Sequence, residues 1–239
     1  MKLLTAAVVV ALSVSLMPST SLAKKVYSPL VKQGELEVET QNEVYRSKNA
    51  GIDGKAKHQI EVSYGVTDFW HTGVYAVYEK PAGGSLAYTQ TKWANIIQLT
   101  PPDTYWLNAG FYIEYIRAAE NLNKDDVLEV KALLEKPIEH WKHTLNMVLK
   151  KTLASNTDTG LEYAWRSRYK MDSGLEPAIE IYGGLGTTKH LNVQDQTHLI
   201  GPVLEYEFFD GFEAAVGWLM NTSEGPAYGD FKLNIEYGF

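Results

Sequence analysis

Charged side chains recur at every second position in several parts of this chain. Because alternate residues of a β-strand point to the same face, such a run would line one face of an extended segment. A stripe of cations beside carboxylates can pair with them, or can orient and select a polar solute through its electric field. The residues with this spacing are Glu162, Arg166, Arg168, Lys170, Glu176, Glu180, Glu205 and Glu207.

Two pairs of residues carry side chains that bind metals or act in catalysis. His140 and His143, with Glu139 beside them, could ligate a metal, but their spacing suits a helical turn, and no further ligand is close in sequence. We expect an exposed polar turn there. His58 and Ser63 are a base and a nucleophile, but they differ in parity, so a strand would place them on opposite faces.

Alternation of apolar and polar residues predicts about twelve β-strands and no amphipathic helix. The last nine residues show it most clearly, since Phe231, Leu233, Ile235, Tyr237 and Phe239 share one face. The expected strands are 34–47, 56–65, 70–80, 86–99, 104–118, 126–135, 142–152, 159–171, 175–187, 196–209, 211–221 and 230–239. The weakest of them is 86–99, where the two faces mix.

The connections between these strands are expected to be short and long in alternation. The short ones are 66–69, 100–103, 171–174 and 209–211, and the longer, polar ones are 46–55, 80–85, 118–126, 152–158, 187–195 and 221–230. Residues 136–142 form a connection that is long for its place in this order. Short turns at one end and long loops at the other are typical of outer-membrane β-barrels, and an even strand count places both termini at the short-turn side, in the periplasm.

Residues 1–23 have the features of an export signal, with Lys2 before an apolar run and Ser21-Leu22-Ala23 as the cleavage pattern. The mature chain would then be residues 24–239, and residues 24–33 would either hang in the periplasm or tuck into the mouth of the barrel. The chain holds 29 acidic and 22 basic residues, so without Lys2 its formal charge is −8. An acidic chain of this kind is unsuited to binding nucleic acid.

If the apolar face meets lipid, the opposite face lines the lumen and is rich in carboxylates. By parity it holds Glu35, Glu37, Glu39, Glu61, Glu114, Glu129, Glu162, Glu176, Glu180, Glu205, Glu207, Glu236, Lys131, Lys150, Arg166, Arg168, Lys170 and Lys232. Two interpretations stay open, because twelve strands lie between a barrel filled by side chains and one with a wide channel. The charges either line an open path or pair and fill the barrel.

The chain resembles small outer-membrane β-barrels of Gram-negative bacteria, some of which are grouped with transporters of aromatic-compound pathways. The resemblance covers most of the mature chain and rests on the segments 25–39, 62–70, 161–169 and 200–208 and on the terminal Leu-Asn-Ile-Glu-Tyr-Gly-Phe. The last segment is similar to the signal read by the barrel-assembly machinery, with Tyr237 and Phe239 as its aromatic positions. The resemblance implies an all-β, single antiparallel transmembrane barrel and carries no catalytic or substrate-binding residue.

Together these features favour a passive channel for small polar or amphipathic solutes in the outer membrane. Outer-membrane lipid, the assembly machinery and a small solute are the expected partners, and no cofactor or metal is expected. The alternative is a structural barrel with a charge-filled lumen that binds a partner through its loops or residues 24–33. A more remote alternative is a lipid-modifying enzyme, which would need a serine–histidine pair on the outer wall.

Overall fold

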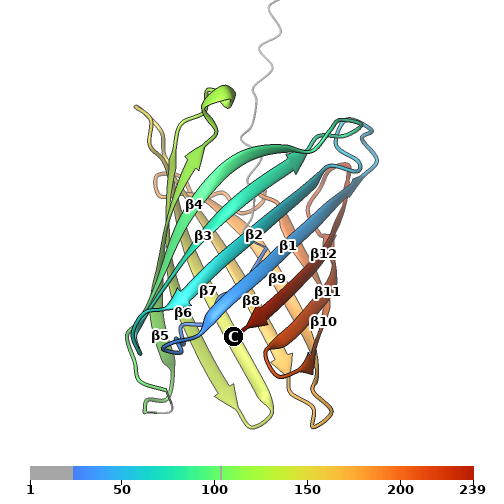
Figure 1. The fold of residues 1–239 in the computed structure, drawn as a ribbon. Helices are drawn as coiled ribbons and strands as arrows, with labels where there is room; N and C mark the ends of the chain where they lie inside the picture. Colours follow the sequence, from blue (N-terminus) through green and yellow to red (C-terminus); the bar gives the residue numbers. More distant parts are fainter. Residues whose placement is uncertain (1–23, 103) are drawn as a thin grey trace, which may run out of the picture.

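Twelve antiparallel strands pair in chain order, and the last strand closes onto the first (Figure 1). The structure, a computed structural model, describes residues 24–102 and 104–239, so the expected signal segment 1–23 lies outside the described residues. The strands are β1 (Leu36–Ser47), β2 (Ala56–Gly65), β3 (Trp70–Lys80), β4 (Ala87–Gln98), β5 (Asn108–Ala118), β6 (Val127–Ile138), β7 (Trp141–Thr152), β8 (Thr159–Tyr169), β9 (Leu175–Thr187), β10 (His198–Phe209), β11 (Phe212–Asn221) and β12 (Ala227–Gly238). The predicted all-β barrel is therefore confirmed.

Several strand boundaries differ from the sequence prediction, and at two places the difference changes the length of a connection. The strand expected over 104–118 begins only at Asn108, after a connection that contains Pro101 and Pro102. Conversely, β6 continues to Ile138 and β7 begins at Trp141, so the connection between them is a two-residue turn. The connection expected to be short, 100–103, is therefore long, and the connection expected to be long, 136–142, is short. A short 3-10 helix (Glu120–Leu122) lies in one loop.

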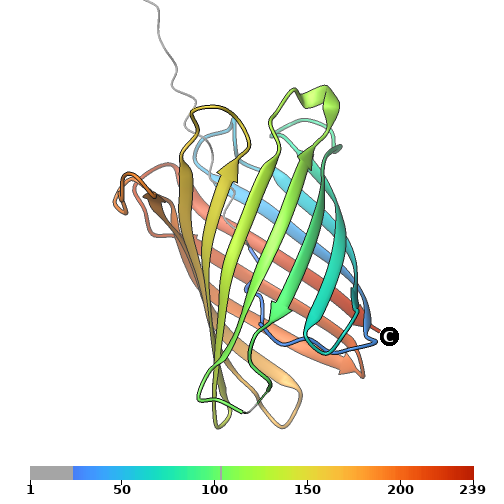
Figure 2. The same cartoon turned by 90° about the vertical axis from the view of Figure 1, so that its left-hand side faces the viewer.

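The two ends of the barrel differ in the length of their connections. At the turn end lie residues 66–69, 99–107, 139–140, 170–174 and 210–211, and at the loop end lie residues 48–55, 81–86, 119–126, 153–158, 188–197 and 222–226. The strands tilt strongly against the barrel axis, and the C-terminus lies at the turn end (Figures 1 and 2). Apart from 99–107, the predicted alternation of short and long connections is confirmed. Among the described residues, no helix is long and apolar enough to cross a bilayer.

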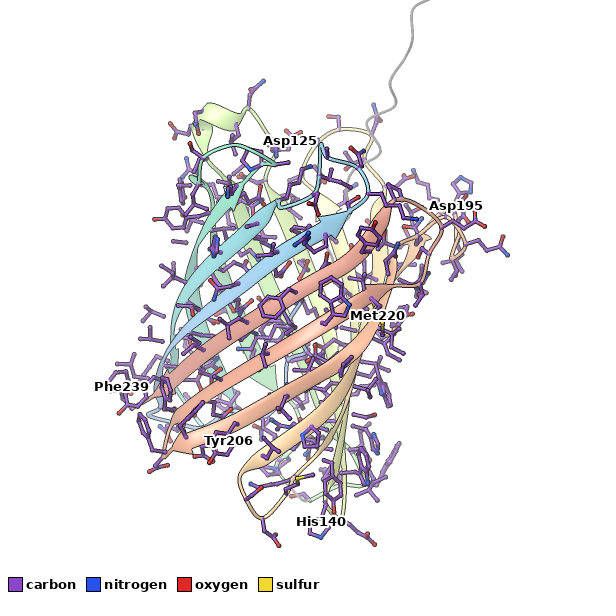
Figure 3. All side chains as sticks on the ribbon, turned by 90° about the vertical axis from the view of Figure 1, so that its right-hand side faces the viewer. Asp125, His140, Asp195, Tyr206, Met220 and Phe239 are labelled. Atoms are coloured by element: carbon purple, nitrogen blue, oxygen red, sulfur yellow. The ribbon has the colours of Figure 1, made fainter. Side chains whose placement is uncertain are left out.

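The wall is apolar outside and polar inside. In β2, Ile60 and Val62 are 47% and 51% exposed on the outer face, whereas their neighbours Glu61 and Ser63 are 6% and 3% exposed. This alternation continues around the barrel, as expected when one face meets lipid and the other a polar lumen. Side chains cover the outer wall of β10–β12 in Figure 3.

Aromatic rings gather where the chain ends. Phe209 stacks on Phe212 at 4.9 Å between ring centroids, and Tyr237 meets Phe239 edge-on at 4.4 Å. The N–H of Phe239 donates a hydrogen bond of 2.8 Å to the carbonyl of Leu36, so the final residue still takes part in closing β12 onto β1. Figure 3 shows Phe239 at the turn end of this closure.

Candidate solute pathway through the barrel lumen

Many charged side chains of the inner wall form ion pairs, some between neighbours on the same or adjacent strands and some across two or three strands. Lys232 lies 2.7 Å from Glu180, Lys92 lies 3.2 Å from Glu114, and Lys131 lies 3.0 Å from Glu129. Removing a charge from water is costly unless an opposite charge and hydrogen bonds replace the lost hydration. The pairing explains how a lumen of this size holds so many charged groups.

The cationic stripe that the sequence suggested on β8 lies partly inside this network. The guanidinium of Arg166 lies 3.4 Å from Glu205, and Arg168 lies 2.8 Å from Glu176 while also contacting Glu205. The stripe is thus bound to the carboxylates of β9 and β10, as the interpretation with paired charges expects.

The remaining residues of the predicted stripe lie at different depths. Glu162 and Glu180 are buried in the lumen, at 4% and 1% exposure. Lys170 and Glu207 are exposed, Lys170 just beyond the end of β8 and Glu207 near the end of β10. Selection of a solute by any of these residues stays a prediction.

Residues 24–33, which we call the leader, run inside the barrel rather than beside it. Asn146 on β7 holds the backbone of Tyr27 from both sides: its side-chain oxygen accepts the Tyr27 N–H at 2.7 Å, and its amide nitrogen donates to the Tyr27 carbonyl at 2.9 Å. Asn146 is fully buried. A polar side chain in this position satisfies backbone groups that the leader could not otherwise pair.

The ring of Tyr27 is enclosed by three strands. It packs on Tyr112 with 4.7 Å between centroids, its hydroxyl lies 3.3 Å from that of Tyr75, and the ammonium of Lys131 lies 4.2 Å from its ring centre and 4.3 Å from that of Tyr112. A cation between two aromatic faces is attracted to both, and the attraction is larger away from bulk water. Tyr27 is therefore anchored through its backbone and its side chain.

The two ends of the leader have anchors of their own. Lys24 forms an ion pair with Asp230, and its carbonyl accepts a hydrogen bond of 3.1 Å from Lys232. Nearer the turn end, the N–H of Val31 donates to the side chain of Gln98 at 2.7 Å. The leader thus extends from the turn end into the half of the lumen next to the loops. It reaches deeper than the barrel mouth, one of the two positions that the sequence suggested.

Two wall glycines provide space for the leader. A Cβ built on Gly65 would meet the carbonyl oxygen of Lys32 at 2.0 Å, and one on Gly110 would meet the Cβ of Pro29 at 2.9 Å. Contacts this short do not occur between real side chains, so the leader can pass this close only where the wall has no side chain. The leader thus explains Gly65, whereas at Gly110 a Cβ would also meet the carbonyl oxygen of Ile97 in the wall at 2.8 Å.

The leader separates the lumen into two cavities. The larger, of about 480 Å³, lies at the turn end, and the smaller, of about 80 Å³, lies at the loop end. Lys25 and Tyr27 line both cavities, so these two residues form the partition between them. A solute that moves from one end of the barrel to the other must therefore pass the leader or displace it.

The two cavities carry opposite charge. The turn-end cavity is lined by eight carboxylates and five lysine or arginine side chains, a formal excess of three negative charges. The loop-end cavity is lined by six lysines and three carboxylates, an excess of three positive charges. Sequence reasoning placed Lys131 and Lys150 on this wall but missed Lys57 and Lys92. The parity of the strand pattern would have identified Lys57, because it shares a face with Glu61.

The other residues singled out from the sequence lie apart from this pathway. Ser63 faces the lumen and donates to Glu37 at 3.3 Å, whereas His58 is on the outer wall, with its Nδ1 2.9 Å from Asn42, so the predicted separation by parity is confirmed. His140 packs on Tyr169, with 5.7 Å between centroids, and His143 lies 2.9 Å from Ser167. The two histidines therefore have different partners.

No family model and no curated protein matches this chain. Solved structures do match it. The COG4313 outer membrane channel from Pseudomonas putida F1 has a TM-score of 0.62 at 12% identity over 92% of this chain and 98% of its own. The KdgM porin has a TM-score of 0.61 at 7% identity over 85% of this chain and 99% of its own. The translocator domain of the autotransporter NalP from Neisseria meningitidis has a TM-score of 0.52 at 11% identity, over 87% and 89%.

The chain has the fold of outer-membrane β-barrels. At these identities the likeness concerns the fold alone, and the matches include both channels and the translocator of a larger protein. One fold can serve several functions, which depend on the residues that line the lumen.

Proposed function

We propose that this protein is a passive outer-membrane channel for small polar or amphipathic solutes, in which the leader occupies the solute path. The observation that carries the proposal is the pair of polar cavities, which meet at Lys25 and Tyr27. The turn-end cavity, at about 480 Å³, falls within the range of cavities that hold small molecules. The path is blocked by a segment joined to the barrel at one end, and not by the wall itself.

The alternative of a filled structural barrel is favoured by the many ion pairs of the inner wall. These pairs, however, lie mostly between neighbours on one side of the lumen, such as Lys131 and Glu129 two residues apart on β6. Side chains paired along the wall leave the centre of the lumen to the leader. Removal of the leader from the lumen would therefore join the two cavities without breaking most of these pairs.

The leader also determines the charge that a solute meets. It contributes Lys24 and Lys25 to the loop-end cavity, and Lys25 and Lys32 to the turn-end cavity. With the leader displaced, the turn-end cavity would keep eight carboxylates and three cations. We therefore expect the open path to prefer cations, since like charges are excluded from a narrow pore of low dielectric. The KdgM porin, a barrel of similar fold, has been solved in complex with disordered oligogalacturonate, so this fold can accommodate a polar ligand.

We also propose how the chain reaches the outer membrane. Export would use residues 1–23 and release a chain that begins at Lys24. Assembly would use Tyr237 and Phe239, whose aromatic rings lie together at the closing strand. Outer-membrane lipid and the barrel-assembly machinery would be the partners at this stage.

Single-channel recording of the refolded protein in planar bilayers under a salt gradient tests the proposal. Discrete openings with a cation-selective reversal potential are expected. The double variant Arg166→Glu with Arg168→Glu removes two positive charges from the turn-end cavity and adds two negative ones, and should shift the reversal potential further towards cations. The matched control is Lys170→Glu, on the same stripe but exposed beyond the strand end. Stable insertion without conductance, both of the wild type and of the Asn146→Ala protein in which the leader has lost its hydrogen bonds to β7, would refute the channel. An unchanged reversal potential would remove the two arginines from the path.

A further inference from the structure

A group of hydrogen-bonding side chains lies on the outer wall, away from the lumen. His143 on β7 and Ser167 on β8 are direct cross-strand partners, and the Nδ1 of His143 lies 2.9 Å from the Ser167 hydroxyl. The indole N–H of Trp165 donates to the same hydroxyl oxygen at 2.9 Å. The imidazole lies between two indoles, with ring centroids 6.1 Å from Trp141 and 5.9 Å from Trp165.

An apolar groove of about 770 Å³ begins at Ser167 and crosses the outer wall. Strand register places its residues in one row: Ser167 pairs with Ile179, Ile179 with Pro202, and Trp218 on the next strand with Phe231. Between Pro202 and Trp218 the paired register of β10 and β11 is interrupted. Pro202 has no N–H to donate there, which accounts for the missing ladder contact at this point of the groove.

The hydrogen-bonding group and the apolar groove are arranged so that the polar head and the apolar tail of one amphiphile could contact them together. His143 is the third residue of β7, which begins directly after the turn at 139–140, so the polar group lies near the turn end. The row continues across β9, β10, β11 and β12, whose outward side chains are apolar: Ile179 is 46% exposed, Leu204 43% and Phe231 41%. Because the strands tilt, a row that crosses them leads away from the turn end towards the middle of the wall.

From this arrangement we propose that the outer wall of β7–β12 binds one glycerophospholipid from the leaflet at the turn end. An acyl chain would lie in the groove, and the His143–Ser167–Trp165 group would bind an ester or phosphate oxygen. If the Ser167 hydroxyl donates to Nδ1 of His143, the imidazole carries its proton on Nε2 and can donate to that oxygen. In the part of the chain that the structure describes, Nε2 of His143 has no other hydrogen-bond partner.

The same group is built for binding rather than for ester hydrolysis. A serine nucleophile needs a base held by a third polar group and donors for the oxyanion. Among the described residues, no carboxylate or amide side chain contacts His143. The indole N–H of Trp165 already binds the serine oxygen, and the neighbouring strand N–H groups are used in the ladder.

Native mass spectrometry of the full mature protein in detergent, titrated with palmitoyl-oleoyl phosphatidylethanolamine, tests this site. The wild type should hold one lipid more tightly than the rest. His143→Phe keeps the ring between the two indoles but removes the hydrogen bonds, and should weaken this lipid roughly five-fold, the factor that about 1 kcal/mol represents. Val216→Trp, which fills the groove from an outward position, should weaken it without touching the polar group.

The matched control is His58→Phe. His58 is also on the outer wall and hydrogen-bonded to its cross-strand partner Asn42, but it lies on β2, apart from the groove. Its variant should bind the lipid as the wild type does. Equal lipid affinity of the His143→Phe and His58→Phe variants would overturn the proposal. A dimer that excludes the lipid would overturn it in favour of a second copy in the groove, and Ser167-dependent release of lysophospholipid would replace binding with hydrolysis.

Discussion

Asn146 should hold the leader in the lumen, and its replacement by alanine should release it. Asn146→Ala removes two hydrogen bonds, of 2.7 and 2.9 Å, from the backbone of Tyr27. Each is worth about 1 kcal/mol net, and a buried N–H or carbonyl left without a partner costs about 1–3 kcal/mol. We therefore expect the docked state to lose about 2–4 kcal/mol, which raises the ratio of undocked to docked leader roughly 30-fold to 900-fold.

Cysteine labelling measures this ratio directly, because the chain contains no cysteine. Val26 is 2% exposed and packs in an apolar cluster with residues of β8–β11, so the variant Val26→Cys should react with a maleimide only when the leader leaves. Adding Asn146→Ala should raise the labelling rate at least about 30-fold if docking is fast relative to the reaction.

The control adds Asn42→Ala, which removes an asparagine from the outer wall, to the same Val26→Cys background. This control should label at the rate of Val26→Cys alone. Labelling within about two-fold of that rate in the Asn146→Ala protein would refute the latch. A fast rate already present without Asn146→Ala would show that the leader is not docked in solution.

Three further predictions concern other parts of the structure. Gly65→Ala should displace the base of the leader, because the three atoms closest to the new Cβ all belong to Lys32 and Gln33; faster labelling at Val26→Cys would show it, and an unchanged rate would contradict it. Phe239→Ala should lower the amount of folded barrel in the outer membrane, measured by heat-modifiable migration, since it removes the ring that packs edge-on against Tyr237 at the closing strand; normal folded levels would count against a role in assembly. In the loop at 48–55, hydrogen bonds from the Ser47 N–H and then Arg46 hold the pKa of Asp53 below its usual value. The stabilising contacts of Asp53 should be complete above the ordinary aspartate pKa of about 3.9 and should be lost as the pH falls through the lowered pKa of this residue. Amide hydrogen exchange at Ser47 can follow this loss.

The barrel was predictable because its sequence signal is local. Each strand carries its own alternation, and Phe231 to Phe239 already shows one face for lipid and one for the lumen. The hairpin at 136–142 was misjudged because Pro137 suggests a loop, although it lies inside β6, opposite Lys142. Lys92 was missed because the pairing of β3 with β4 shifts in register between Val77 and Tyr78. This shift disturbs the alternation of inward and outward residues along β4.

The content of the lumen could not be predicted from the same signal. The contact of Tyr27 with Asn146 joins residues 119 positions apart, and that of Lys24 with Lys232 joins residues 208 apart. The residue types do not indicate these partners, because an asparagine in a strand can equally well face a water-filled lumen. The outer-wall pair of His143 and Ser167 depends in turn on the exact register of β7 against β8, which the strand pattern leaves open.

The leader also has a place in the order of folding. Its anchors belong to strands from both halves of the chain, including Gln98 on β4, Asn146 on β7 and Asp230 on β12. The complete set of these contacts needs strands from β4 to β12, so we expect docking to be completed only once the wall is closed. A freshly closed barrel should therefore pass through a stage with a complete wall and an unplugged lumen, in which recently inserted molecules conduct more than aged ones.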